Sequence, residues 1–545
     1  MYPGAHLATR PHDPAVIVEN EHGVDEVVTF TQLESRSIQV ARALRSRGLR
    51  PGDHLAVLAT NTARVFDIYW AAMRSGLYLT MVNWHLTPGE AAYIVDDCGA
   101  RALIVDAALA EMAGDMVALT PHVETRWSCS GSIDDHEDLD IAAAAESTEA
   151  PADQPRGADM LYSSGTTGRP KGIKPELPDR QVGDPGDTMT TMNQTVWGVG
   201  PDTVYLSPAP LYHAAPLRTC AAVQALGGTV VVLDRFDAER ALSAIERHRV
   251  TYSQWVPTMF VRMLRLPDEV RTRYDVSSLR VAVHAAAPCP VDIKRQMIDW
   301  WGPILSEYYS STELNGLTIV DTGEWLQRPG TVGRAALGTV RICDESGAEV
   351  GAGTIGTIYF ERDRLPFEYH KAPEKTRAAQ HPEHLTWTTT GDVGYVDEDG
   401  YLFLTDRSSF LIISGGVNIY PQEIEDALLA HPDVLDAAVV GLPDPDLGER
   451  VTAVVQPVPA RLGMSPDGSG GVDAASDQTS GDGTATWIDD ALAAELLDHL
   501  RGRIAGFKLP RAIVFRDSLP RTPAGKLVKR TITEDVLEGA RSRAR

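Results

Sequence analysis

The stretch "LYSSGTTGRPKG", from Leu161 to Gly172, gathers hydrogen-bond donors on a flexible piece of chain. Its hydroxyls and glycines let side-chain and backbone donors approach a ligand closely, because glycine has no Cβ. Lys171 adds a positive charge, and Pro170 restricts the chain that leads into it. These donors suit a polyphosphate, although the Walker pattern is absent and a flexible polar loop explains the composition equally well. The residues concerned are Ser163, Ser164, Gly165, Thr166, Thr167, Gly168 and Lys171.

On both sides of this stretch, short apolar runs alternate with amphipathic segments. The runs at 54–61 and 101–107 are rich in Val, Ile and Leu, which indicates buried strands. Between them, residues 63–76 have helical spacing of apolar side chains and end at a glycine. The pattern recurs with a strand at 227–236 and a helix over 237–250. This alternation predicts an α/β fold with layered, largely buried sheets.

The pattern changes near residue 406. From there the chain holds strand candidates, a glycine pair and a helix beginning near Pro421, which is typical of a small separate α+β unit. We therefore expect two domains, one over 1–406 and one over 407–545. Within the second, residues 461–487 are rich in Gly, Ser, Asp and Thr, with almost no large apolar side chains. Such a composition predicts a flexible surface insertion, since it cannot bury enough surface to offset its ordering entropy.

The composition narrows the class of protein. The 545 residues carry a formal net charge of -25, from 75 acidic against 50 basic residues, which argues against nucleic acid as a partner. The chain opens with no secretory pattern and contains no apolar run of about 18 residues, so we expect no transmembrane segment and a cytoplasmic location. The five cysteines form no C-x-x-C pair, which predicts reduced thiols and neither disulfides nor a zinc site.

A second segment with chemistry is "EYYSSTELNG" at 307–316. A tyrosine ring from Tyr308 or Tyr309 can stack on a base, and the hydroxyl of Thr312 can reach a phosphate. The carboxylate of Glu313 can hold Mg²⁺, which prefers oxygen ligands and keeps several waters. Together these groups suit a nucleotide with its metal ion.

Two later segments add groups of the same kind. "TTTGDVGYVDEDGYLFLTDR" at 388–407 offers Asp392 as an acceptor for two ribose hydroxyls. It ends at Arg407, whose guanidinium suits ribose or phosphate oxygens. "LPRTPAGKLVKR" at 519–530 places Lys526 after a Pro/Gly turn near the C-terminus.

These four segments, in this order, resemble the adenylate-forming (AMP-binding) superfamily over nearly the whole chain. "SPAPLYHAAPL", "VHAAAPCP", "WWGPILSEYYSSTE" and "IISGGVNIYPQEIE" are most similar to the bacterial acyl-CoA synthetase, or fatty-acid–CoA ligase, branch. The resemblance implies a large N-terminal adenylate-forming domain and a small mobile C-terminal α+β domain. It also implies an acid–thiol ligase that uses ATP, Mg²⁺ and coenzyme A. A carboxylate attacks the α-phosphate of ATP, and the thiol of coenzyme A then displaces AMP from the acyl-adenylate.

The resemblance assigns roles around the phosphates. Residues 163–171 would hold the β- and γ-phosphates, Thr312 would contact the α-phosphate, and Glu313 would bind the magnesium. Lys526 would enter the site from the small domain during adenylation. There it would bridge the substrate carboxylate and phosphate oxygens and offset the repulsion between them.

The resemblance also assigns the nucleoside site. Tyr309 would lie against adenine, Asp392 would bind the ribose hydroxyls, and Arg407 would lie beside it. The floor under adenine and part of the acyl wall would come from one segment. Its members are His284, Ala285, Ala286, Ala287 and Pro288.

The acyl group and coenzyme A would be held by further residues of the resemblance. His213, Trp255 and His284 match positions that line the acyl channel, and ordinary core packing is the alternative explanation of such side chains. Gly415 and Gly416 match a loop beside the coenzyme A tunnel, where glycines would let the pantetheine arm pass close to the backbone.

Two positions depart from the family pattern. The family usually has Asp or Lys at the hinge where this chain has Ser409, so the hinge is expected to work with an altered rate or resting pose. The usual Gly-Gly of the adenine floor is Ala285-Ala286 here, and two added methyl groups narrow that floor.

The acid itself is not determined by the sequence. Small, aromatic and apolar pocket candidates predict a hydrophobic acyl group, with a fatty acid first and a ring acid or sterol side-chain acid also compatible. An acyl-AMP ligase that delivers its product to a carrier protein shares every ATP motif. A peptide-synthetase adenylation domain and a degenerate nucleotide-binding protein rank below this carrier-dependent ligase. A homodimer is compatible with the sequence.

Overall fold

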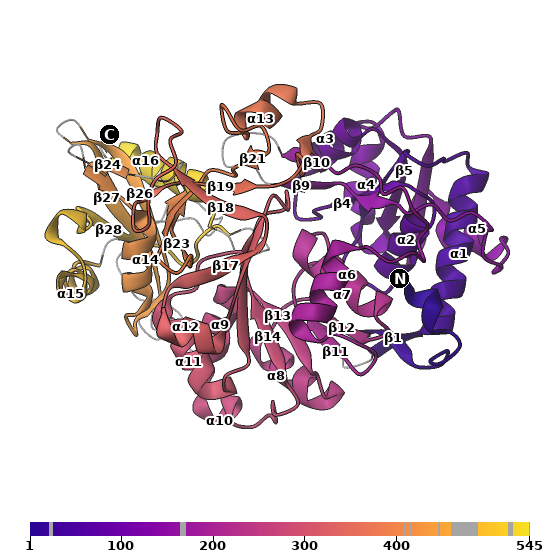
Figure 1. Cartoon of the computed structure of the whole chain (residues 1–545), viewed down its shortest axis with the longest axis horizontal. Helices are drawn as coiled ribbons and strands as arrows, with labels where there is room; N and C mark the ends of the chain where they lie inside the picture. The colour runs from indigo at the N-terminus through magenta and orange to yellow at the C-terminus, as the bar shows by residue number, and fades with distance from the viewer. Residues whose placement is uncertain are drawn as a thin grey trace.

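Within the described residues, a computed structural model shows four β-sheets with helices packed around them (Figure 1). Strands and helices alternate through the first 300 residues, so the predicted α/β fold is confirmed. The described residues are 1–20, 25–163, 170–407, 410, 412–414, 417–444, 447–458, 489–521 and 527–543.

The largest sheet has 14 strands and runs through the centre of the molecule. Its middle strands are parallel and its two ends are antiparallel. The order is β18 (Thr339–Cys343), β19 (Gly356–Glu361), β22 (Asp392–Val396), β23 (Leu402–Arg407), β17 (Thr331–Leu337), β16 (Leu317–Asp321), β15 (Leu305–Ser310), β14 (Val281–His284), β13 (Tyr252–Trp255), β11 (Val204–Ser207), β12 (Thr229–Leu233), β1 (Pro14–Glu19) and β2 (Asp25–Thr29), with β21 (Trp387–Thr388) on β19.

A second sheet of six parallel strands lies beside it. Every residue of β3 and β4 is buried, which explains why both strands are continuous apolar runs in the sequence. The order is β7 (Glu137–Asp138), β6 (Thr125–Cys129), β5 (Ala100–Asp106), β3 (His54–Leu58), β4 (Tyr78–Val82) and β8 (Ala158–Asp159).

A small three-stranded antiparallel sheet joins distant parts of the chain. Its strands are β20 (Glu368–Tyr369), β10 (Lys171–Lys174) and β9 (Leu161–Ser163). Lys171 lies opposite Ser163, so the donor-rich stretch begins and ends on neighbouring strands. Ile173 lies opposite Tyr369, which brings a segment 200 residues away to the same place.

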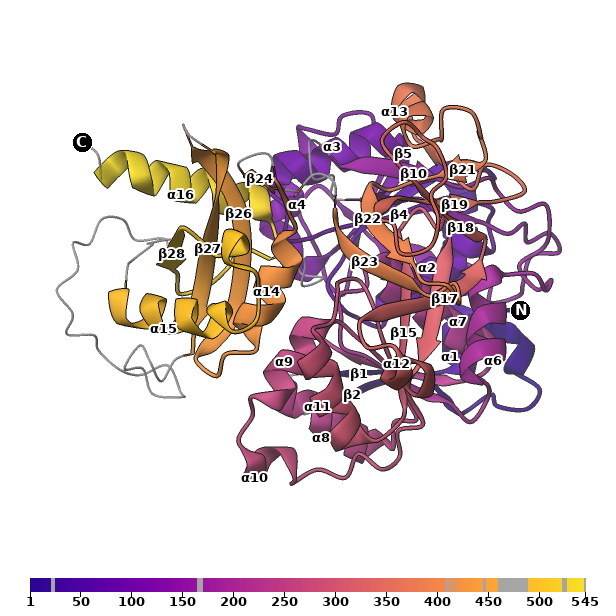
Figure 2. The ribbon, with the colours of Figure 1, turned by 60° about the vertical axis from the view of Figure 1, so that its left-hand side comes forward.

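The C-terminal part has its own five-stranded sheet. The turned view shows this sheet to one side of the larger body, together with α14 (Pro421–Leu429), α15 (Asp490–Arg501) and α16 (Lys529–Arg543) (Figure 2). The chain leaves the large sheet after Arg407 and enters this sheet at Ile412. A boundary at 406/407 remains a prediction, and the insertion at 461–487 lies outside the described residues. The strands are β25 (Val417–Ile419), β24 (Ile412–Ser414), β27 (Gly448–Pro457), β26 (Val434–Asp444) and β28 (Ala512–Phe515).

Local signals determine where several helices begin. The side chains of Thr29 and Thr87 each accept a hydrogen bond from the N3 backbone N–H. The N3 side chain in turn accepts one from the backbone N–H of the threonine, which forms a capping box. The helices are α1 (Phe30–Ser46), α2 (Arg64–Met73), α3 (Pro88–Cys98), α4 (Ala110–Val117), α5 (Leu139–Ala144), α6 (Thr188–Trp197), α7 (Ala214–Ala225), α8 (Ala238–His248), α9 (Pro257–Leu264), α10 (Asp268–Arg271), α11 (Val291–Trp301), α12 (Thr322–Gln327), α13 (Pro373–Ala378), α14 (Pro421–Leu429), α15 (Asp490–Arg501) and α16 (Lys529–Arg543). None of these described helices is long and apolar enough to span a bilayer.

Candidate functional site

The lysine of the donor-rich stretch and the candidate metal ligand meet at one tyrosine. The Lys171 Nζ atom lies 4.8 Å from the centre of the Tyr369 ring. The Tyr369 hydroxyl donates a hydrogen bond of 2.8 Å to the Glu313 Oε1 atom. Glu313 is only 9% exposed, so its carboxylate is held away from bulk water. The structure therefore brings Lys171 and Glu313 together, as expected of two groups that share a phosphate–metal site.

The loop that follows β15 is also held by an arginine on α7. The carbonyl oxygen of Thr312 accepts a hydrogen bond of 3.4 Å from Arg218 on α7. Arg218 also donates to Asp159 at 2.8 Å. Sequence reasoning missed Arg218 and Asp159, because neither lies in a recognisable motif. Residues 164–169 and the side chain of Ser163 lie outside the described residues, so their assigned phosphate contacts stay a prediction.

The nucleoside candidates also lie together. The Tyr309 hydroxyl donates a hydrogen bond of 2.6 Å to Asp392 Oδ2, and Thr390 donates to the same atom at 3.0 Å. Asp392 is 7% exposed, and Arg407 lies directly opposite it in the β22–β23 ladder. The Arg407 side chain is not among the described parts. The structure thus joins the ends of β15, β22 and β23 where the sequence predicted ribose and adenine contacts.

The expected adenine floor begins where β14 ends. Ala286 has a φ of +76°, a left-handed conformation that costs an L-residue roughly 1–2 kcal/mol. Glycine adopts this conformation without that cost, which explains in physical terms why the family pattern has glycine there. The Ala287 and Pro288 side chains follow on the same turn, and their contacts with adenine remain a prediction.

We expect Ala286→Gly to raise the free energy of unfolding by up to about 1 kcal/mol, because relief of strain exceeds the added backbone entropy of glycine. Urea unfolding followed by circular dichroism measures this change. The matched control is Ala285→Gly next to it, where φ is not positive and the residue is only 5% exposed. That substitution should lower the stability. Equal losses from both would contradict the strain at Ala286.

His284, at the end of β14, belongs to a buried cluster of three ionisable groups. The Lys294 Nζ atom lies 2.6 Å from Glu307 Oε2, and His284 Nε2 lies 3.5 Å from the same oxygen. Burial, together with the nearby ammonium group, holds the pKa of His284 well below its ordinary value, so the imidazole is neutral. The pair joins α11 to β15, the strand that carries Tyr309.

The three acyl-channel candidates differ in their surroundings. The His284 ring packs edge-on against Phe260 at 5.5 Å, and Trp255 packs against Trp301 at 5.5 Å, both fully buried. His213 is half-buried at the N-cap of α7. Trp255 and His284 are thus packed in the core, and an acyl-binding role for His213, Trp255 and His284 stays a prediction.

Several predicted residues cannot be placed. Lys526, Ser409, Gly415 and Gly416 lie outside the described residues. Their assigned functions in adenylation, at the hinge and beside the coenzyme A tunnel remain predictions.

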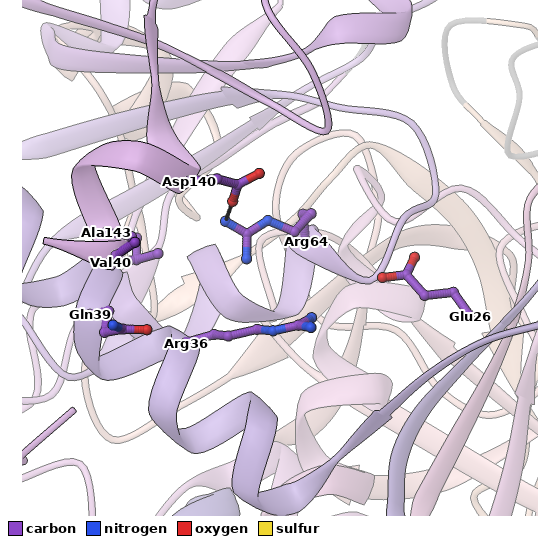
Figure 3. A pocket seen from close by; sticks show the side chains of 8 residues that line it. Glu26, Arg36, Gln39, Val40, Arg64, Asp140 and Ala143 are labelled. Atoms are coloured by element: carbon purple, nitrogen blue, oxygen red, sulfur yellow. Dashed lines mark hydrogen bonds and ion pairs between the residues drawn. The ribbon is translucent and has the colours of Figure 1, made fainter. Parts of the chain in front are cut away.

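Two pockets lie elsewhere in the part of the chain that the structure describes. One of about 310 Å³ lies among α1, α2 and α5, where Arg64 pairs with Asp140 and Arg36 and Glu26 complete a balanced set of charges (Figure 3). The other, of about 650 Å³, lies between α9 and α11 on one side and α14 on the other. None of the predicted site residues that the structure describes lines either pocket.

Comparison with known proteins agrees with this arrangement. The model of the AMP-binding enzyme family matches residues 5–366, and that of its C-terminal domain matches residues 423–526. The chain is 32% identical to a feruloyl-CoA synthase from an Amycolatopsis species over 95% of both chains. It is 30% identical to the fatty acid–[acyl-carrier-protein] ligase ScoC of Streptomyces coeruleorubidus over 97% of this chain and 94% of ScoC. The ATP-bound structure of MatB from Rhodopseudomonas palustris superposes with a TM-score of 0.75 at 28% identity, over 98% of this chain and 99% of MatB.

Proposed function

The chain belongs to the AMP-binding enzyme family, among the adenylate-forming acyl-CoA ligases that use ATP, Mg²⁺ and coenzyme A, and we propose that it acts on a hydrophobic carboxylic acid, first of all a fatty acid. In the first half-reaction a carboxylate oxygen bonds to the α-phosphorus of ATP and pyrophosphate leaves. In the second, the thiol sulfur of coenzyme A bonds to the acyl carbon, the thiol proton is lost and AMP leaves. We also propose a cytoplasmic location for the protein, because ATP and coenzyme A are both available there.

The observation that carries this proposal is the meeting of two pairs of groups. Lys171 and Glu313 meet at Tyr369, and Tyr309 and Asp392 share a hydrogen bond. A cation and a carboxylate at one place suit the phosphates and their counterion, and an aromatic ring beside a carboxylate suits a nucleoside. Positioning and charge stabilisation contribute most to such phosphoryl chemistry, so few groups need to react covalently.

Glu313 fits the role of magnesium ligand. A mostly buried carboxylate that accepts one hydrogen bond at Oε1 retains lone pairs for a hard cation. When bound, the magnesium ion would neutralise phosphate charge. Tyr369 orients the carboxylate, and Lys171 supplies a further positive charge on the neighbouring strand.

The class of acid is supported by the chemistry of the candidate pocket. Its members are aromatic, imidazole or small side chains, and they include no aspartate that would suit an amine on the substrate. The relatives act on different acids, as their names state: a feruloyl group in one and a fatty acid in another. Both groups are hydrophobic, which favours that common class.

A carrier-dependent acyl-AMP ligase is the second candidate function. The similarity to ScoC, whose name states an acyl-carrier-protein acceptor, favours it. The two functions share the adenylation half-reaction and differ in the thiol that attacks the acyl carbon.

Mass spectrometry of the products distinguishes the two functions. The purified protein receives ATP, Mg²⁺ and coenzyme A with short, medium and long fatty acids, aryl acids and polycyclic acids, in parallel with reactions that lack coenzyme A. We expect acyl-CoA and AMP to accumulate with hydrophobic acids, and acyl-AMP to appear where coenzyme A is omitted. Acyl-AMP without thioester in the complete mixture would favour the carrier-dependent ligase. No AMP with any acid would contradict both functions.

A further inference from the structure

Tyr369 is held rigidly at the junction of three segments. Its backbone pairs with Ile173 in the β10–β20 ladder, and its N–H donates a hydrogen bond of 2.9 Å to Thr376 Oγ1. The Phe367 ring packs edge-on against it at 5.1 Å, and the Tyr369 side chain is 7% exposed. Both its ring face and its hydroxyl are therefore fixed in place.

The ring separates two opposite charges. The ammonium group of Lys171 lies over the ring face, while the Glu313 carboxylate accepts from the hydroxyl at the ring edge. A half-buried lysine and a mostly buried carboxylate near each other would otherwise attract each other. Direct pairing would neutralise both, and a phosphate and a metal ion would have to break that pair before binding.

The contacts that Tyr369 offers are weaker than those that a ligand offers. A cation over an aromatic face is attracted more weakly than an ammonium group is by several phosphate oxygens. A hydroxyl hydrogen bond orients a carboxylate without removing its charge. Tyr369 thus holds both groups in place through contacts that a phosphate and a metal ion can replace.

We propose that Tyr369 is a positioning residue that prevents Lys171 and Glu313 from pairing with each other. The lysine is thereby available to the phosphates of ATP and the carboxylate to Mg²⁺. This inference rests on the proposed function for the two charged groups, but it adds a residue that the sequence motifs do not single out.

Calorimetric titration with ATP, in the presence and absence of Mg²⁺, tests this inference without a need for the acid. Tyr369→Phe keeps the ring and loses the hydroxyl, so ATP alone should bind as in the wild type. Affinity for ATP with Mg²⁺ should fall about tenfold, since a hydrogen bond to a charged group is lost. Equal affinities for wild type and variant under both conditions would overturn the role of the hydroxyl.

Tyr369→Leu removes both contacts and allows the two charges to pair. Affinity for ATP alone should then fall by about 5- to 30-fold. Adding Glu313→Gln to this variant should restore most of the affinity for ATP alone, because the competing carboxylate charge is gone. A purely structural tyrosine would show no such rescue, and its absence in a folded double variant would overturn the inference.

Tyr401 supplies the matched control. Its hydroxyl donates to Glu324 at 2.9 Å and its ring carries the Arg328 guanidinium at 4.2 Å, the same two contacts at another place. Tyr401→Phe and Tyr401→Leu should leave ATP binding unchanged. If the wild type itself binds no ATP, the proposed function fails; if it binds ATP with Mg²⁺ and both Tyr369 variants bind equally well, this inference alone fails.

Discussion

Replacing Lys526 with alanine should slow formation of the acyl-adenylate by about 100- to 1,000-fold, the range seen when one stabilising donor is removed from a transition state. The family resemblance places this lysine between the substrate carboxylate and the phosphate oxygens, two groups that repel each other as they approach. Without the ammonium charge, that repulsion remains in the transition state. ATP–pyrophosphate exchange with an acid accepted by the enzyme measures the loss.

The second half-reaction provides an internal comparison. When the acyl-adenylate is supplied ready-made, the Lys526→Ala variant should form the thioester at close to the wild-type rate, because the lysine is assigned to adenylation only. Arg530→Ala is the matched control, since this exposed residue at the start of α16 pairs with Glu534 and should leave exchange unchanged. Unchanged exchange in Lys526→Ala would show that the lysine is wrongly assigned.

Lys294→Met should lower the free energy of unfolding by about 3–5 kcal/mol at neutral pH, because it leaves a buried carboxylate without its partner. Lys294 is fully buried and Glu307 is 4% exposed, so water cannot replace the lost ammonium group. Denaturant unfolding monitored by tryptophan fluorescence measures the change.

The loss should depend on pH in a defined direction. Burial already raises the pKa of Glu307 above its ordinary value, although Lys294 lowers it. Without Lys294 the pKa rises further, and the folded variant binds a proton more tightly than the unfolded chain. The variant therefore loses stability as pH rises through the raised pKa and regains it toward about pH 4–5, near the ordinary pKa of glutamic acid.

A double variant separates the charge from the packing. Lys294→Met combined with Glu307→Gln has no charge left to bury, so it should recover much of the lost stability and lose the added pH dependence. A double variant as unstable as Lys294→Met at every pH would show that packing of the lysine chain, and not the ion pair, stabilises α11 against β15.

Much of the site can be predicted from the sequence because each motif is local. Tyr309 lies in one strand, Glu313 follows that strand, and Asp392 begins another, so their chemistry is recognisable without a fold. Their contacts are not recognisable in this way, because β15 and β22 belong to segments about 80 residues apart. The hydrogen bond from Tyr309 to Asp392 exists only because the large sheet brings these strand ends together.

The place of Tyr369 in the site could not be predicted from the sequence. The segment around it carries no pattern that indicates chemistry, and only the pairing of β20 with β10 brings its ring to Lys171. His284 and Trp255 illustrate a similar limit: a residue in a family motif can point into the core, and the direction of a side chain depends on packing.

The sequence by itself determined the α/β class, the family and the kinds of group that the site contains. These could be predicted because apolar periodicity and short motifs depend only on residues close together in the chain. The tertiary structure alone decided which of these groups meet: Lys171 and Glu313 at Tyr369, Tyr309 at Asp392, and Lys294 at Glu307. The physical reason is that strand order and register set distances between residues far apart in the chain. Hydrogen bonds and ion pairs require those distances to within a few tenths of an ångström.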